Sequence, residues 1–127
     1  MKLSEYFERA KGKGIIATAD ANGKVGMAVY ARPHFINEKT VAFIMADRLM
    51  HKNLQSNPSA SYLFVEDGSQ YTGKRLCLTK IKEEKDSDIV YWFRSNGSCP
   101  VDESYKEGQR FVVYFKVNKV LPLIGAK

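Results

Sequence analysis

The stretch FIMADRLMHKNLQSNPSASYLFV, residues 43–65, joins two apolar runs through a short polar segment. Each apolar run has the length and composition of a buried strand, and Asn57-Pro58 ends the polar segment between them. Asp47 is a good helix-capping residue, so the polar segment predicts a helix of barely two turns that ends near Ser56. We therefore expect a strand, a short helix and a second strand here.

Three basic residues, Arg48, His51 and Lys52, lie at the start of this predicted helix. Cations are unfavourable at a helix N-terminus, where the dipole is positive and the first backbone N–H groups are free. A phosphate or another anion bound at this position would compensate them. The alternative interpretation is an ordinary solvated face, and the residues alone leave both interpretations open.

Further strands are predicted on either side of this stretch, separated by turn signals. Residues 14–20 and 24–36 form two β-type runs, and the Ala21-Asn22-Gly23 turn between them predicts an antiparallel hairpin. The remaining predicted strands cover residues 40–46, 59–65, 74–82 and 110–125. Six short strands, mostly in sequential hairpins, predict a mainly β fold: a closed or partly closed antiparallel barrel with short helices.

Two more helices and a bend are predicted near the ends of these strands. An apolar i, i+4, i+7 pattern beside Ser4, a capping residue, predicts a short helix over residues 4–11. Acidic residues followed by an apolar stripe predict a longer helix over residues 83–94. A polar, turn-rich segment follows over residues 95–109, and the last strand is expected to bend at Asn118.

The composition bounds the class of protein. The 127 residues predict a single domain, 1–127, and 44% hydrophobic with 27% charged residues is typical of a globular protein, here with a net charge of +6. No apolar run reaches the roughly 20 residues of a spanning helix, and the N-terminus lacks the pattern of a secretory signal, so a cytoplasmic location is expected. Cys77, Cys99 and only two histidines indicate neither a zinc site nor a disulfide framework.

The order of strands and turns resembles a known family. The segments GIIATADANGKV, VYARPHFI, TVAFIMADRLMHKNLQSNPSASYLFVED and KRLCLTKIKEE are similar to the pyridoxamine 5'-phosphate oxidase-related family of FMN-binding split-barrel proteins, over about residues 3–85. The most specific element is Lys52 followed by Asn57-Pro58 after an apolar strand. In the family, that lysine and the residue before it hold the FMN phosphate. The corresponding residues here are Lys52 and His51.

The resemblance implies a homodimer of six-stranded barrels with two FMN molecules in grooves at the subunit interface. Residues 28–33 and 44–46 would run along the isoalloxazine ring, and Lys74 or Arg75 would reach the cofactor across the dimer. Ala28 stands where the oxidase proper carries a basic residue, and Arg32 would compensate for it. The candidate cofactor-binding residues are Val29, Tyr30, Ala31, Arg32, Met45, Ala46, Arg48, Met50, His51, Lys52 and Lys74.

The resemblance also implies a small FMN-dependent oxidoreductase or electron-transfer flavoprotein, with no catalytic acid–base pair evident in the sequence. The oxidase proper ends in a segment with arginine and tryptophan that binds pyridoxal phosphate, whereas no arginine follows Arg110 here, so vitamin B6 oxidation is not expected. Deazaflavin or haem in place of FMN is an alternative, and haem would need His34 or His51 as a ligand. A second alternative is a basic barrel that binds nucleic acid, although the cations are spread rather than clustered.

Overall fold

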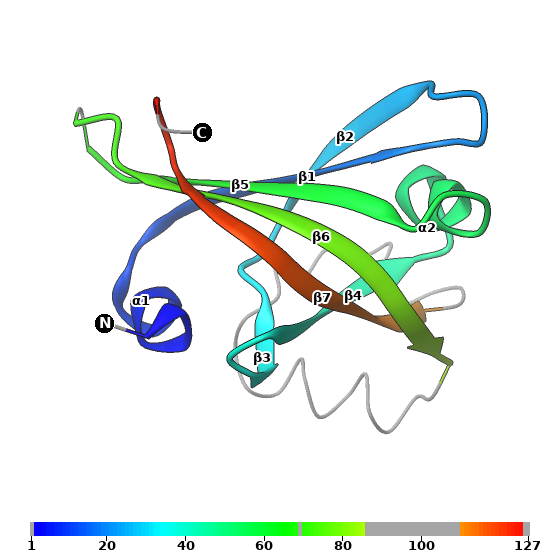
Figure 1. Ribbon diagram of the computed structural model, residues 1–127, viewed down its shortest axis with the longest axis horizontal. Helices are drawn as coiled ribbons and strands as arrows, with labels where there is room; N and C mark the ends of the chain where they lie inside the picture. The colour runs from blue at the N-terminus through cyan, green and yellow to red at the C-terminus, as the bar shows by residue number, and fades with distance from the viewer. Residues whose placement is uncertain (1, 69, 86–109, 126–127) are drawn as a thin grey trace.

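The structure is a computed structural model that describes residues 2–68, 70–85 and 110–125 (Figure 1). The elements follow one another as α1 (Leu3–Arg9), β1 (Gly12–Ala19), β2 (Val25–Tyr30), β3 (His34–Asn37), β4 (Thr40–Ala46), α2 (Leu49–Leu54), β5 (Ser59–Glu66), β6 (Gly73–Glu84) and β7 (Arg110–Pro122). The predicted mainly β class with short helices is confirmed. None of the helices in these described ranges is long and apolar enough to cross a membrane.

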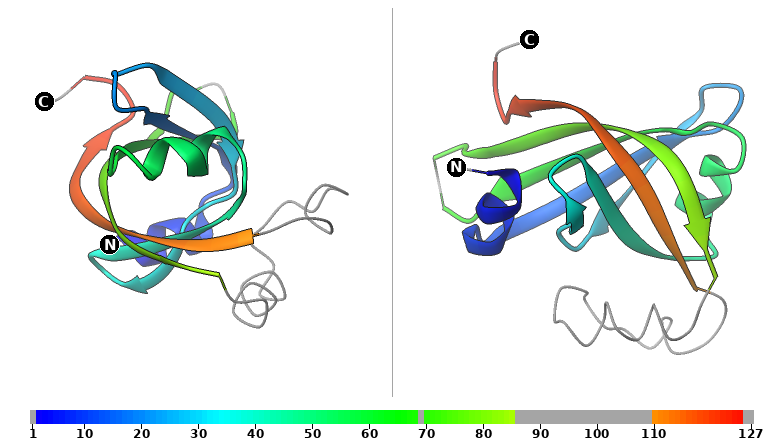
Figure 2. Two further views of the ribbon diagram at one scale, coloured as in Figure 1. Left: turned by 90° about the vertical axis from the view of Figure 1, so that its right-hand side faces the viewer. Right: turned by 60° about the horizontal axis from the view of Figure 1, so that its bottom comes forward.

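The strands form one antiparallel sheet in the order β2-β1-β5-β6-β7-β4-β3. The sheet coils around a central core, with α1 at one end and α2 at the other (Figures 1 and 2). The edge strands β2 and β3 have one hydrogen-bonded neighbour each within the described sheet, so the barrel is split. This arrangement places the ends of β4 and β6 beside α2.

The predicted strand over residues 24–36 is in fact two strands, which makes the described strands seven rather than six. The chain leaves β2 after Tyr30 and resumes as β3 at His34, and β3 pairs with β4 at the other edge of the sheet. Pro33 has no N–H to donate to a ladder and restricts the residue before it, so the run breaks at this position. One apolar run therefore supplies both edges of the barrel.

The N-terminal helix is capped from elsewhere in the chain. Ser4 lies inside α1, and the capping residue, Lys2, makes no side-chain cap hydrogen bond, so the predicted role of Ser4 as cap is wrong. Instead, the Ser4 backbone N–H (3.4 Å) and its hydroxyl both donate to the carboxylate of Glu38, in the turn between β3 and β4. A carboxylate at this end of a helix complements the positive end of its dipole.

The predicted start of the helix over residues 83–94 is wrong. Glu83 and Glu84 are the last residues of β6, where they pair with Val113 and Val112 of β7. The ladder to β7 thus overrides the local acidic signal, as tertiary context commonly does. The rest of that predicted helix and the polar segment over residues 95–109 lie outside the described residues.

The last strand bends where the sequence predicted. Leu78 pairs with Val117 and Cys77 pairs with Lys119, so Asn118 is the extra residue of a β-bulge in β7. A bulge increases the local twist of a strand, which helps β6 and β7 to coil along the barrel. β7 can therefore pair with β6 along its length and with β4 near its start.

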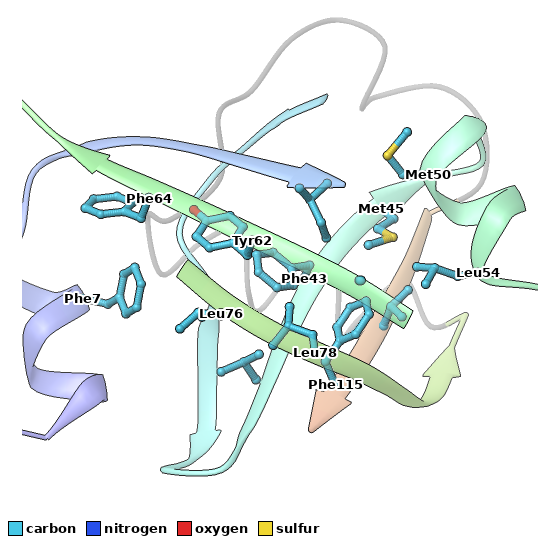
Figure 3. Packing of buried hydrophobic residues seen from close by; sticks show 14 residues of the cluster. Phe7, Phe43, Met45, Met50, Leu54, Tyr62, Phe64, Leu76, Leu78 and Phe115 are labelled. Carbon is cyan, nitrogen blue, oxygen red and sulfur yellow. The ribbon is translucent and has the colours of Figure 1, made fainter. Parts of the chain in front are cut away.

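The core fills the inside of the barrel and is rich in aromatic rings (Figure 3). It comprises Phe7, Ile16, Val41, Phe43, Met45, Met50, Leu54, Ala60, Tyr62, Phe64, Leu76, Leu78, Val113 and Phe115. Phe7 of α1 enters from one end, where its ring meets Phe64 edge-on at 5.1 Å between centroids. Met50 and Leu54 of α2 enter from the other end, so burial of these side chains fixes the position of α2.

Candidate functional site

α2 is anchored to β1 by a buried polar contact as well as by its apolar face. Asn53 Nδ2 donates to Thr18 Oγ1 at 3.1 Å, and Thr18 Oγ1 in turn lies 3.3 Å from Met50 Sδ. All three side chains are buried. Gly26 of β2 permits the close approach, since a Cβ there would lie 2.8 Å from Met50 Cε. The helix is therefore held firmly against the hairpin of β1 and β2.

The start of α2 differs from the prediction. The N-cap residue is Arg48, without a side-chain cap hydrogen bond, so the predicted role of Asp47 as N-cap is wrong. The Asp47 carboxylate lies instead 3.1 Å from Nδ1 of His51, one turn along the helix. The helix ends at Leu54, within two residues of the predicted end.

His51 lies at the centre of a polar network between α2 and the end of β6. Its side chain is buried, with Nδ1 facing Asp47 and Nε2 only 2.9 Å from Oε2 of Glu83. The imidazole also stacks on the Phe111 ring of β7, with centroids 3.9 Å apart and planes 13° apart. Both ring nitrogens of His51 are therefore engaged by carboxylates.

Glu83 receives hydrogen bonds from several groups of this network. Its Oε1 accepts from Lys80 Nζ at 2.6 Å and from Gln55 Nε2 at 2.9 Å. Burial raises the pKa of the Glu83 carboxyl, but hydrogen bonds from Gln55, Lys80 and His51, with the charge of His51, outweigh burial and lower this pKa to about 2. Glu83 is consequently a carboxylate throughout the physiological pH range.

A shallow groove of about 710 Å³ lies over this network. It is lined by Asp47, Arg48, Leu49, His51, Lys52, Gln55, Glu83 and Phe111. Arg48 and Lys52 are exposed, and neither side chain makes an ion pair with any residue that the structure describes. Lys52 also borders a second groove, of about 500 Å³, between α2 and the hairpin of β1 and β2. Two cations without ion-pair partners among the described residues thus face solvent beside a network centred on the buried His51.

Around this groove the structure brings together three of the residues predicted to bind a cofactor: Arg48, His51 and Lys52. The predicted residues next to them in the chain serve other contacts. Met45 and Met50 are buried in the core, and the Ala46 carbonyl accepts the Arg48 N–H at 2.8 Å.

The predicted residues on and after β2 do not line this groove. Val29 is 72% exposed on the outer side of the edge strand, whereas Tyr30 packs against the core. The Ala31 carbonyl accepts a hydrogen bond of 3.0 Å from the Tyr62 hydroxyl. Their assignment to the ring of a cofactor stays a prediction.

Arg32 and Lys74 both lie at the α1 end of the barrel, away from α2. Arg32 Nη1 donates to the Phe7 carbonyl of α1. Lys74 Nζ lies 4.6 Å from the centroid of the Tyr6 ring, and Lys74 is near the opposite end of β6 from Glu83. Within one chain these two cations therefore do not join Arg48 and Lys52.

Four lining residues of the network were not singled out from the sequence: Asp47 as a histidine partner, Gln55, Glu83 and Phe111. The Asp47–His51 spacing of four residues is a helical-neighbour signal that could have shown their contact. No local signal connects His51 to Glu83, which is 32 positions away and follows β5 and most of β6. That contact follows only from the pairing of whole strands.

Comparison with protein-family models and with curated proteins found no match. Solved structures do match. An FMN-binding protein from Syntrophomonas wolfei subsp. wolfei has a TM-score of 0.76 at 16% identity, covering 99% of this chain and 86% of that one. A protein assigned as a pyridoxamine 5'-phosphate oxidase from Lactobacillus delbrueckii has a TM-score of 0.67 at 15% identity, covering 92% and 88%. The predicted resemblance is therefore confirmed at the level of the fold, which is the split barrel of these proteins.

Proteins named for other cofactors have the same fold. An F420 reductase matches with a TM-score of 0.68 at 12% identity, covering 92% of this chain and 94% of that one. The haem storage protein HutZ from Vibrio cholerae matches with a TM-score of 0.64 at 17% identity, covering 94% and 90%. The fold alone does not select among these cofactors.

Proposed function

We propose that this chain binds FMN and works as a small FMN-dependent oxidoreductase or electron-transfer protein. The observation that carries the proposal is the pair of exposed cations, Arg48 and Lys52, beside the groove at α2. They lack ion-pair partners among the described residues and match the chemistry of a phosphate group. The FMN-binding protein with the same fold supports this choice of ligand.

The proposed roles of the protein are binding and orientation. Arg48 and Lys52 would hold the phosphate, and the residues predicted to run along the isoalloxazine ring would seat it. Bound flavin would supply the redox chemistry, because it accepts and donates hydride or electrons itself. The protein would then need no catalytic acid–base pair of its own.

The first experiment is to measure FMN binding. Purified protein is expected to be yellow or to take up added FMN, and Lys52→Ala is expected to weaken the affinity roughly 10- to 100-fold, the usual range for losing one charged hydrogen bond to a phosphate. Lys39→Ala, which removes an exposed cation from the turn between β3 and β4, is the matched control and should bind as the wild type does. Protein that takes up no FMN would overturn the proposal.

The same measurement distinguishes the alternative cofactors, since FMN, F420 and haem have distinct absorption spectra. F420 also carries phosphate, so the groove suits both flavins. Haem is less well supported because both ring nitrogens of His51 are engaged by Asp47 and Glu83.

We further propose that the functional unit is a homodimer. The outer side of β2 exposes Val25, Met27 and Val29, at 65%, 68% and 72% of their surfaces. These residues alternate along an edge strand, so they form a continuous apolar strip on a strand that could accept a partner. A second subunit on this strip would cover these three apolar side chains.

A further inference from the structure

We propose that His51 is a positioning residue whose imidazolium neutralises Asp47 and Glu83, so that Arg48 and Lys52 meet the phosphate of a ligand without competing carboxylates. The inference rests on the proposed function, because it concerns the same groove. It differs from the role that the resemblance implies for His51, which is direct contact with the phosphate.

The hydrogen-bond partners of the His51 ring favour its doubly protonated form. Nδ1 and Nε2 of His51 each face an oxygen of a different carboxylate, Asp47 and Glu83, at 3.1 and 2.9 Å. A carboxylate oxygen only accepts, so each ring nitrogen must donate a proton. Gln55 Nε2 lies 3.1 Å from Nε2 of His51, but its two hydrogens are used by the His51 carbonyl and by Oε1 of Glu83. Donation from both nitrogens of His51 is the imidazolium form, and these contacts favour it.

The charge of this imidazolium matters because of what surrounds it. The charged groups that face His51 or the groove are Asp47 from the link after β4, Arg48 at the N-cap of α2, Lys52 in its last turn, and Lys80 and Glu83 from β6. Phe111, packed on the ring from β7, is uncharged. Lys80 pairs with Glu83 at 2.6 Å, which leaves the imidazolium as the partner of Asp47 and the second partner of Glu83. Without it, an uncompensated carboxylate would lie beside the phosphate.

The binding test compares FMN with riboflavin, which lacks the phosphate. His51→Gln is expected to weaken FMN binding about tenfold, the effect of removing one nearby charge in a half-exposed site, and to leave riboflavin binding unchanged. In the double variant Asp47→Asn, His51→Gln, one carboxylate is removed along with the charge that balances it, while Glu83 keeps Lys80 as its partner. FMN affinity is then expected to return to within about threefold of wild type, a difference near 0.7 kcal/mol.

A direct phosphate contact from His51 predicts the opposite for the double variant, which would stay as weak as the single variant. That result would overturn the inference while leaving the proposed function intact. An unchanged FMN affinity in His51→Gln would overturn it as well. Wild-type protein that binds neither FMN nor riboflavin would overturn the proposed function, and this inference with it.

A second measurement needs no ligand and no variant. Nitrogen–proton correlation spectra of the two imidazole rings are expected to show both ring nitrogens of His51 protonated at neutral pH. His34 provides the internal comparison, because burial lowers its pKa to about 4 and keeps that ring neutral. A neutral His51 ring with a single nitrogen-bound proton would overturn the inference even if His51→Gln weakened FMN binding.

Discussion

Glu83 is the residue on which the charges at the α2 end of the barrel converge. It accepts hydrogen bonds from Lys80, Gln55 and His51, and it is the last but one residue of β6. A carboxylate held in this way has a pKa below its usual value only in the folded protein. Its hydrogen bonds therefore stabilise the fold in a pH-dependent manner.

Replacing Glu83 should reveal that dependence. The pKa of this carboxyl falls from a usual 4.5 to about 2 on folding, so its stabilisation is complete above pH 4.5 and is lost as the pH falls toward 2. Glu83→Gln is expected to lower the free energy of unfolding by about 2 kcal/mol at pH 6, and the difference from wild type should vanish near pH 2. Urea denaturation at a series of pH values measures both.

Glu8→Gln, at an exposed position of α1, is the matched control and should change the free energy of unfolding by less than about 0.5 kcal/mol. If Glu83→Gln lowered the free energy of unfolding equally at pH 6 and pH 2, the loss of stability would not come from the charge of Glu83.

Single residues of the site were predictable only where a local pattern identified them. Arg48 and Lys52 were found because cations at the predicted start of a short helix are anomalous, and Asn57-Pro58 marked where that helix ends. That placement is wrong for Lys52, which lies in the last turn of α2 because the helix begins only at Leu49. The part that Glu83 plays was missed because its neighbours in sequence are acidic and favour the start of a helix. Glu83 belongs to β6 because it pairs with β7, and the local sequence over residues 83–94 gives no sign of that pairing.

At the scale of elements, β5 has closely packed neighbours on both sides. Gly12 of β1 and Gly73 of β6 approach its backbone so closely that an added Cβ would lie 2.1 Å from the Val65 carbonyl oxygen and 1.9 Å from that of Phe64. Both contacts are with backbone atoms, which cannot turn aside as a side chain can. The tight coil of β1, β5 and β6 thus depends on glycine at these two positions.

Gly73→Ala should therefore destabilise the protein through overpacking. A loss of about 2–3 kcal/mol in the free energy of unfolding is expected, since β5 or β6 must shift. Thermal or urea denaturation measures the loss, with Ser61→Ala, on the exposed side of β5, as a control that should change stability by less than about 0.5 kcal/mol. Equal stability of Gly73→Ala and wild type would mean that the two strands can separate without cost.

Most elements were predictable because their apolar runs are bounded by clear turns. The predicted strand over residues 40–46 coincides with β4, and residues 59–65 fall within β5. The run over residues 24–36 misled because its composition is continuous across Pro33, while the chain crosses from one edge of the sheet to the other there. The cap of α1 could not be predicted, because Glu38 reaches it only once the sheet has formed.

At the scale of the whole molecule, the split leaves the barrel with an open side. β2 forms one edge of the sheet, and the three side chains of its apolar strip are 65%, 68% and 72% exposed. The order of hairpins predicted the barrel. The location of its two edges depends on where the apolar run over residues 24–36 divides into β2 and β3. Burial of that strip against a second subunit would stabilise the assembly by the hydrophobic effect.

Met27→Lys should accordingly separate the subunits. The substitution places a charge in the middle of the strip on β2, and burying that charge would outweigh the remaining apolar contacts. Sedimentation velocity should give the mass of a dimer for wild type and of a monomer for Met27→Lys. Ile81→Lys, at a residue of β6 that is 55% exposed, is the control and should stay dimeric. Wild-type protein with the mass of a monomer would contradict the proposal.

The attachment of α2 by two polar contacts and by its apolar face has one more consequence. Asn53 joins the helix to Thr18 on one flank and His51 joins it to Glu83 on the other, while Met50 and Leu54 enter the core between them. A helix attached on three sides has little room to swing or unwind. The groove beside it therefore takes its shape during folding, and the proposed anionic ligand would lose little affinity to the ordering of its receptor.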